Sequence, residues 1–124
     1  MKKTVILLVE DNPLHQQSSL KALEELGFTY EIANNGAEAL TKMQKASFDL
    51  ILMDIDMPVM NGIEATEKIR KIYGTETARF ALSAYNQVEM KEAYPDADFE
   101  VYLNKPLSTS ELSLALAEQK MKSR

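Results

Sequence analysis

The sequence predicts an α/β fold in which an open parallel β-sheet is covered by helices on both faces. Two observations predict it. Short apolar runs alternate with segments of helical periodicity five times along the 124 residues. The first and third runs are apolar on both faces, which is typical of central strands in a parallel sheet covered on both sides. Such alternation gives parallel strands joined by right-handed crossovers.

The apolar runs are the predicted strands. The second run alternates apolar and polar residues more clearly than the others, which indicates an edge strand. In chain order, the predicted strands are Thr4–Glu10, Phe28–Ala33, Asp49–Asp54, Arg79–Ala84 and Glu100–Lys105.

The intervening segments carry helix start and stop signals. Asn12 followed by Pro13 predicts a capped first helix, which Gly27 ends. Ser108 and Glu111 have the spacing of a capping box at the start of the last helix. The positions expected to face the core are Leu20, Leu23 and Leu26 in the first helix, Ala37, Leu40 and Met43 in the second, Ile63, Thr66, Ile69 and Ile72 in the third, which Gly74 ends, and Leu112, Ala115, Leu116 and Gln119 in the last; the fourth helix, around Gln87–Tyr94, is short and weakly patterned.

Length and composition indicate one soluble domain spanning residues 1–124. The net charge of −5, without a basic stripe, argues against direct binding of nucleic acid. The absence of cysteine excludes disulfides and thiolate sites, which fits a cytoplasmic protein. The apolar run at the N-terminus stops at Glu10 and Asp11, so we interpret it as a strand and not as a signal peptide; no segment is long enough to cross a membrane.

Polar side chains gather where the predicted strands end. Glu10 and Asp11 end the first strand, Asp54 the third, Ser83 the fourth and Lys105 the fifth. In open parallel sheets, sites lie at the carboxyl ends of the strands, where the strand order reverses. We therefore expect these side chains to meet at one edge of the sheet.

This set of side chains suits phosphoryl transfer. Clustered carboxylates repel one another unless a cation joins them, and Mg²⁺ prefers carboxylate oxygens together with a phosphate. We predict that Asp11, Asp54 and one backbone carbonyl hold Mg²⁺ and that Asp54 is the nucleophile. Lys105 then supplies a second positive charge and Ser83 a hydrogen bond to the phosphoryl group.

Three motifs, "VEDN", "MDIDMPVMNG" and "LNKP", resemble those of response regulator receiver domains of two-component signalling. The resemblance covers essentially the whole chain, including the spacing between the motifs. It implies the flavodoxin-like strand order 2-1-3-4-5, a cofactor of Mg²⁺ or Mn²⁺, and a sensor histidine kinase or histidine phosphotransfer protein as partner. It also implies phosphorylation at Asp54, a water-mediated contact of Glu10 with the metal, and a metal contact from the backbone carbonyl of Asp56.

The resemblance assigns the remaining site residues as well. Lys105 and the backbone N–H of Ala84 would bind the phosphoryl group, and the bond before Pro106 would be cis. Ser83 would move toward the phosphoryl group, and Tyr102 would turn into the vacated space. The fourth helix, the fifth strand and the last helix would then present a changed surface to a downstream partner.

Asp56 and Tyr85 stand out against the family pattern, and His15 is a further polar side chain early in the first helix. Asp56 is acidic where uncharged side chains are common, so it is expected to affect access to the phosphoryl group. Tyr85, two residues beyond Ser83, is bulky and is expected to shield the acyl phosphate from water. His15 has no partner nearby in the sequence, so we expect it to be solvated and not to bind metal.

Other functions remain possible on sequence alone. The Asp-x-Asp after an apolar strand also resembles haloacid-dehalogenase-like phosphatases, in which Asp54 would be the nucleophile and Asp56 the general acid; the two βα units before the motif argue against this. An interaction module without phosphorylation is a third possibility. A nucleotide-binding protein is not favoured, because no glycine-rich loop follows the first strand. The chain ends soon after the last helix, so we expect a free-standing regulator or a receiver cut from a hybrid kinase.

Overall fold

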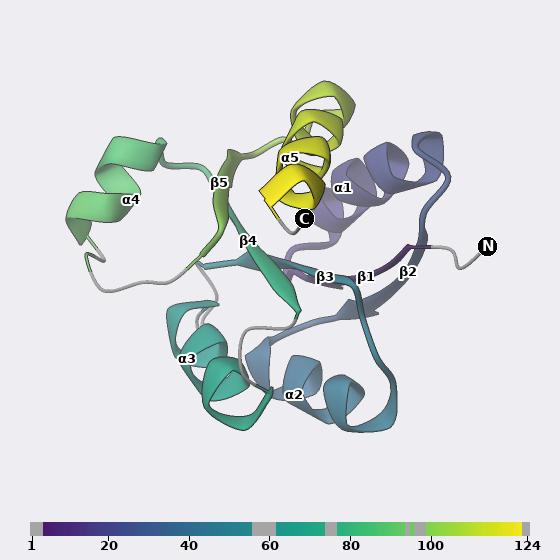
Figure 1. Cartoon of the computed structure of the whole chain (residues 1–124), viewed down its shortest axis with the longest axis vertical. Coiled ribbons are helices and arrows are strands. Elements are labelled where there is room, and N and C mark those ends of the chain that lie inside the picture. The colour runs from purple at the N-terminus through teal and green to yellow at the C-terminus, as the bar shows by residue number, and fades with distance from the viewer. Residues whose placement is uncertain (1–3, 56–61, 74–76, 94, 96–98, 123–124) are drawn as a thin grey trace.

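Strands and helices alternate through the computed structural model, which describes residues 4–55, 62–73, 77–93, 95 and 99–122. The elements lie close to the segments predicted from the sequence (Figure 1). In chain order they are β1 (Val5–Val9), α1 (Pro13–Glu25), β2 (Thr29–Ala33), α2 (Gly36–Lys45), β3 (Leu50–Asp54), α3 (Gly62–Tyr73), β4 (Ala78–Ser83), α4 (Gln87–Ala93), β5 (Val101–Asn104) and α5 (Thr109–Lys122).

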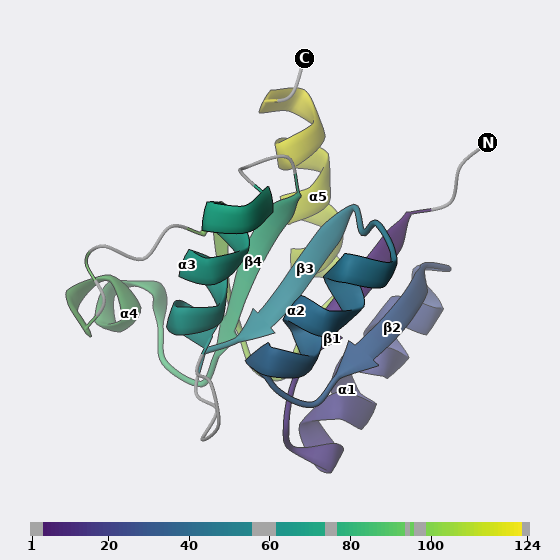
Figure 2. The same cartoon turned by 90° about the horizontal axis from the view of Figure 1, so that it is seen from below.

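The strands form one parallel sheet in the order β2-β1-β3-β4-β5 (Figure 2). The strand order implied by the family resemblance is therefore confirmed. β1 and β3 lie at the centre and are almost entirely buried, whereas β2 lies at one edge and alternates in exposure, as predicted. Strand order reverses between β1 and β3, so their carboxyl ends border the expected site.

Helices cover both faces of the sheet (Figure 1). α1 and α5 pack on one face, and α2 and α3 pack on the other. α4 lies beside β5 and contributes Met90 to the second face. The helix residues buried in the two core clusters are Ala22, Leu23, Leu112 and Ala115 on the first face, and Ala39, Met43, Ala65, Ile69 and Met90 on the second.

The predicted helix boundaries are confirmed at three places. The Asn12 side chain accepts hydrogen bonds from the backbone N–H groups of Leu14 and His15, at 2.9 and 3.2 Å. Gly27 follows α1 with φ of +76°, a left-handed conformation that glycine adopts without a side-chain clash. The Ser108 hydroxyl accepts a hydrogen bond from the Glu111 N–H at 3.3 Å.

Two predicted core positions were wrong. Ala37 is exposed, because α2 buries Ala39 and Met43 instead. Ile72 is 62% exposed, because α3 buries Ala65 and Ile69. The side chains of Ile63 and Thr66, and the predicted stop at Gly74, lie outside the described residues.

Candidate functional site

The register of the central strands brings the predicted site residues to one edge of the sheet. Val9 of β1 pairs with Met53 of β3, so Glu10 and Asp54 are the next residues on neighbouring strands. Asp54 pairs with Leu82 of β4. Ser83 pairs with Asn104 of β5, and Lys105 follows directly. Backbone pairing alone therefore aligns one site residue from each of four adjacent strands.

Three carboxylates converge at this edge. Oxygen atoms of Glu10, Asp11 and Asp54 all lie within 4.8 Å of one another. Glu10 and Asp54 are fully buried, whereas Asp11 is partly exposed. This donor set fits Mg²⁺, which takes oxygen ligands and keeps several of its waters on the solvent side. Asp56, expected to add a backbone carbonyl and to affect phosphate access, lies outside the described residues.

Lys105 reaches into the cluster from the end of β5. Its Nζ lies 2.9 Å from Glu10 Oε1 and 3.0 Å from Asp54 Oδ2. Burial alone would lower the pKa of Lys105, but its hydrogen bonds to Glu10 and Asp54 outweigh burial and raise the pKa. The ammonium group therefore stays charged beside Asp54. The bond between Lys105 and Pro106 is cis, as the resemblance implied.

The Glu10 carboxyl group has a pKa raised from 4.5 to about 7. Burial is the largest cause and a hydrogen bond with Asp54 the next, while Lys105 and the Asn12 N–H act in the opposite direction. The Asn12 N–H donates to Glu10 Oε2 at 3.2 Å. Without a metal, the site thus relieves the repulsion between two buried carboxylates by retaining a proton near neutral pH.

The end of β4 places Ser83 and Ala84 beside the acids. The buried Ser83 hydroxyl accepts a hydrogen bond from the Tyr85 N–H at 3.0 Å, which holds the turn after the strand. Ala84 lines a pocket at the mouth of the site together with Asp11, Asp54 and Lys105. Both predicted phosphoryl-binding positions of β4 therefore lie at the acidic cluster.

The two tyrosines predicted to act near the site occupy different environments. Tyr102 is half-buried in β5, where its ring packs edge-to-face on Phe99 at 5.8 Å and lies 5.7 Å from Lys91 Nζ of α4. Tyr85 is 54% exposed. Tyr102 thus links α4 to β5 through its neighbours, while Tyr85 is exposed two residues after Ser83.

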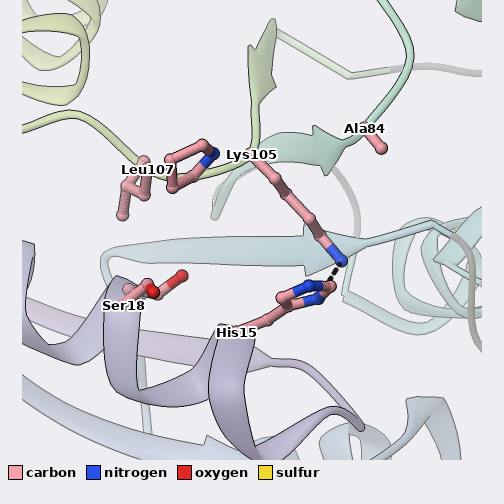
Figure 3. Close-up of a pocket in the computed structure, with 7 residues that line it drawn as sticks. His15, Ser18, Ala84, Lys105 and Leu107 are labelled. Carbon is pink, nitrogen blue, oxygen red and sulfur yellow. Dashed lines mark hydrogen bonds between the residues drawn. The ribbon is translucent and has the colours of Figure 1, made fainter.

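Sequence reasoning missed the role of His15. Figure 3 shows its ring beside the Lys105 side chain, with Nδ1 3.3 Å from Nζ. The same Nδ1 lies 3.8 Å from Glu10 Oε1. His15 is solvated as expected, with 48% of its side chain exposed, but its contacts with Lys105 and Glu10 were not predicted. Its position three residues after the cap of α1 was the available signal, because the first turn of that helix starts at the acidic edge of the sheet.

Sequence reasoning also missed Gln16. Its side-chain amide donates to the backbone carbonyl of Glu10 at 2.6 Å and to Asn34 Oδ1 at 2.9 Å. Gln16 therefore ties the end of β1 to the loop after β2. No motif singles out this glutamine, because both of its acceptors belong to other segments.

Comparison with known proteins assigns the chain to a family. It matches the response regulator receiver domain family over residues 6–117. Two-component response regulator 24 of Arabidopsis thaliana is 35% identical over 111 residues, covering 89% of this chain and 79% of that protein. Histidine kinase 5 of the same plant is 41% identical over 90 residues, covering 73% of this chain and 10% of the kinase. The chain spans 3% to 12% of the lengths of the histidine kinases compared with it.

Solved structures give the same result. The receiver domain of sensor histidine kinase PA1611 from Pseudomonas aeruginosa PAO1, solved with a magnesium ion in its active site cleft, has a TM-score of 0.84 and 33% identity; the match covers 94% of this chain and 97% of that one. The chemotaxis response regulator CheY4 of Vibrio cholerae has a TM-score of 0.82 and 30% identity, covering 94% and 98%.

The comparisons with known proteins give no support to the phosphatase alternative. Among the described helices, none has the length and apolar character needed to cross a membrane. Because the family match extends over residues 6–117, the protein belongs to the response regulator receiver domains, which serve as switches in two-component signalling.

Proposed function

We propose that Asp54 accepts a phosphoryl group from a phosphohistidine of a sensor histidine kinase or histidine phosphotransfer protein. One observation carries this proposal: the buried Asp54 carboxylate lies between a cluster of acids and the Lys105 ammonium group, 3.0 Å away. Receiver domains bind Mg²⁺ at an acidic pocket and pair with histidine kinases or phosphotransfer proteins, which supports the same chemistry here.

In the proposed transfer, the acids bind the metal ion and Lys105 stabilises the phosphoryl group. Asp11, Asp54 and the backbone carbonyl of Asp56 would hold Mg²⁺ or Mn²⁺, with Glu10 acting through a metal-bound water. The ion, when bound, neutralises negative charge on the phosphoryl oxygens. An oxygen of Asp54 bonds to phosphorus as the bond from phosphorus to the donor imidazole nitrogen breaks. Lys105, the Ser83 hydroxyl and the Ala84 N–H stabilise the phosphoryl oxygens.

Phosphorylation would then change the surface formed by α4, β5 and α5. The phosphoryl oxygens can accept the proton of the Ser83 hydroxyl, and movement of Ser83 toward them would strain the bond that its oxygen accepts from the Tyr85 N–H, now 3.0 Å long. Movement of Ser83 makes room for the half-buried Tyr102 ring. Because that ring packs between β5 and α4, its rotation shifts the population of two surface states that a downstream partner distinguishes.

The domain and its location follow from the same proposal. Residues 1–124 would act as a single receiver domain, either as a free-standing regulator or as part of a longer hybrid kinase. The cytoplasm would be its place of action, because it is there that the proposed phosphodonor proteins meet their receivers. Neither nucleic acid nor a membrane is a proposed direct partner.

Mass measurement of the intact protein tests the proposal. After incubation with acetyl phosphate and Mg²⁺, we expect the wild type to gain one phosphoryl group. Asp54→Asn should gain none, and a chelator should prevent the gain in the wild type. Asp49→Asn is the matched control, because Asp49 precedes the same strand at its opposite end and is exposed. Labelling of Asp54→Asn, or continuous hydrolysis of an aryl phosphate by the wild type, would contradict the proposal.

A further inference from the structure

His15 and Lys105 meet across the site from segments 90 residues apart. His15 projects from the first turn of α1, and Lys105 from the loop after β5 (Figure 3). Together with Ala84, they line both the pocket above Asp54 and a second pocket of about 260 Å³ that extends toward Ser18 and Leu107. The contact therefore lies on the boundary between the phosphorylation site and a neighbouring hollow.

The hydrogen-bonding capacity of the ammonium group gives this contact a defined role. An ammonium group has three protons to donate and no acceptor. Glu10 Oε1 lies 2.9 Å away and Asp54 Oδ2 3.0 Å away, so they can take two of these protons. His15 Nδ1, at 3.3 Å, can take the third. Because Lys105 only donates, Nδ1 must be the unprotonated nitrogen of the ring in this contact.

Exposure shows on which side His15 acts. The Lys105 side chain is 12% exposed, whereas that of His15 is 48% exposed. The two carboxylates hold Nζ from the buried side, and the imidazole holds it from the side that faces solvent. Water would otherwise take the third proton in many orientations, and the position of Nζ would be less well defined.

We propose that His15 is a positioning residue for phosphoryl transfer, which keeps the Lys105 ammonium group aimed at Asp54. This inference rests on the proposed function of Asp54. When a phosphoryl group arrives, Lys105 exchanges its carboxylate contacts for phosphoryl oxygens. Among the described partners of Lys105, the imidazole carries no negative charge and stays in place. Lys105 therefore enters the transfer with one fixed contact, and less reorganisation is needed.

Variants of His15 separate the acceptor atom from the bulk of the ring. His15→Leu removes the acceptor and keeps an apolar side chain of similar reach on an exposed part of α1. His15→Gln restores an acceptor oxygen. Ser18→Ala is the matched control, because it removes from the same neighbouring pocket a hydroxyl that donates to the Leu14 carbonyl.

The first measurement needs no phosphorylation. At pH 8, in nitrogen-15 spectra of lysine side chains, we expect the wild type, His15→Gln and Ser18→Ala to show a Lys105 ammonium signal protected from exchange with water. The signal should be broadened or lost in His15→Leu, and Lys105→Arg assigns it. A protected signal that persists in His15→Leu would overturn the proposed contact.

The second measurement is the rate constant of phosphorylation by acetyl phosphate at saturating Mg²⁺. We expect His15→Leu to be slower by about 3- to 10-fold, a small part of the loss expected from removing a catalytic hydrogen-bond donor. His15→Gln and Ser18→Ala should remain close to the wild type. An unchanged rate in His15→Leu, or an equal loss in His15→Gln, would overturn the positioning role. If the wild type itself takes up no phosphate, the proposed function fails, while the lysine spectra still test the contact.

Discussion

Burial determines the protonation of Glu10. Its carboxyl group is fully buried next to Asp54, and its pKa is raised to about 7 by burial first and by the Asp54 carboxyl second. Lys105 opposes both effects but does not cancel them. The metal-free site therefore carries a proton where the metal-loaded site would carry a cation, and the two compete.

This raised pKa makes the stability of the metal-free protein depend on pH. The folded protein retains the Glu10 proton up to about pH 7, whereas the ordinary value is 4.5. The resulting stabilisation, on the order of 3 kcal/mol, is fully present below pH 4.5 and is lost as the pH rises through about 7. We expect the free energy of unfolding of Glu10→Gln to fall less than that of the wild type over this window, in urea titrations with a chelator. Parallel curves for the two proteins would contradict the assignment.

Tyr85 is expected to lengthen the lifetime of the phosphorylated state. Its backbone N–H is fixed by the Ser83 hydroxyl, and the residue is 54% exposed. We expect Tyr85→Ala to shorten the half-life of the acyl phosphate by at least about twofold, because water gains access to the phosphorus. Tyr85→Phe keeps the ring and should match the wild type. Loss of phosphate followed by mass measurement checks this, and equal half-lives would refute shielding.

Residues near strand ends were easier to predict than those that support them. Glu10, Asp54, Ser83 and Lys105 follow apolar runs, so the α/β pattern was sufficient to place them at one edge. His15 was missed because its partner is 90 residues away and the register of α1 against β5 is not encoded in either segment. A contact of this kind depends on how a helix is rotated about its axis on the sheet, and the local sequence pattern does not specify that rotation.

Strands were predicted more accurately than the buried faces of helices. A central strand is apolar on both faces, so any register of its residues is consistent with burial. On α2 and α3, the apolar residues three apart drift around the helix, and Ala37 and Ile72 end outside the buried face. The observed stripes use residues four apart, such as Ala65 and Ile69, and their alanines allow close approach to the sheet.

The pair of elements α4 and β5 carries the predicted switch. Tyr102 of β5 contacts Phe99, which precedes the strand, and Lys91 of α4 lies over its ring. We expect Tyr102→Ala to be phosphorylated within about twofold of the wild-type rate, because the ring makes no contribution to the transfer chemistry. The amide shifts that phosphorylation causes in α4 and β5 should shrink in Tyr102→Ala and persist in Tyr102→Phe. Unchanged shifts in the alanine variant would discard the aromatic part of the switch.

At the scale of the whole molecule, the two ends of the sheet have different roles. The carboxyl end holds the acids and Lys105, whereas the opposite end holds an ion pair between a buried arginine and a partly exposed glutamate. Arg79 is 1% exposed at the start of β4, and its backbone N–H and its guanidinium group donate to Glu100 at 2.8 and 3.4 Å. The Glu100 N–H donates in return to the Arg79 carbonyl at 3.0 Å. These bonds hold the start of β5 against β4, away from the cluster of Glu10, Asp11 and Asp54.

Separation of the two ends predicts that stability can be changed without changing the chemistry. Glu100→Ala removes a carboxylate partner of the buried Arg79 guanidinium, and we expect a loss of about 1–3 kcal/mol in the free energy of unfolding. The double variant Arg79→Met/Glu100→Ala should recover part of that loss, because no charge remains buried at this position. Urea titrations measure both values. The rate of phosphorylation by acetyl phosphate should stay within about twofold of the wild type in either variant, because the site residues lie at the other end of the strands. This rate is measured at urea concentrations well below the unfolding transition. A large drop in the phosphorylation rate of a variant that remains fully folded would show that the sheet transmits strain from one end to the other. The proposed division of roles would then fail.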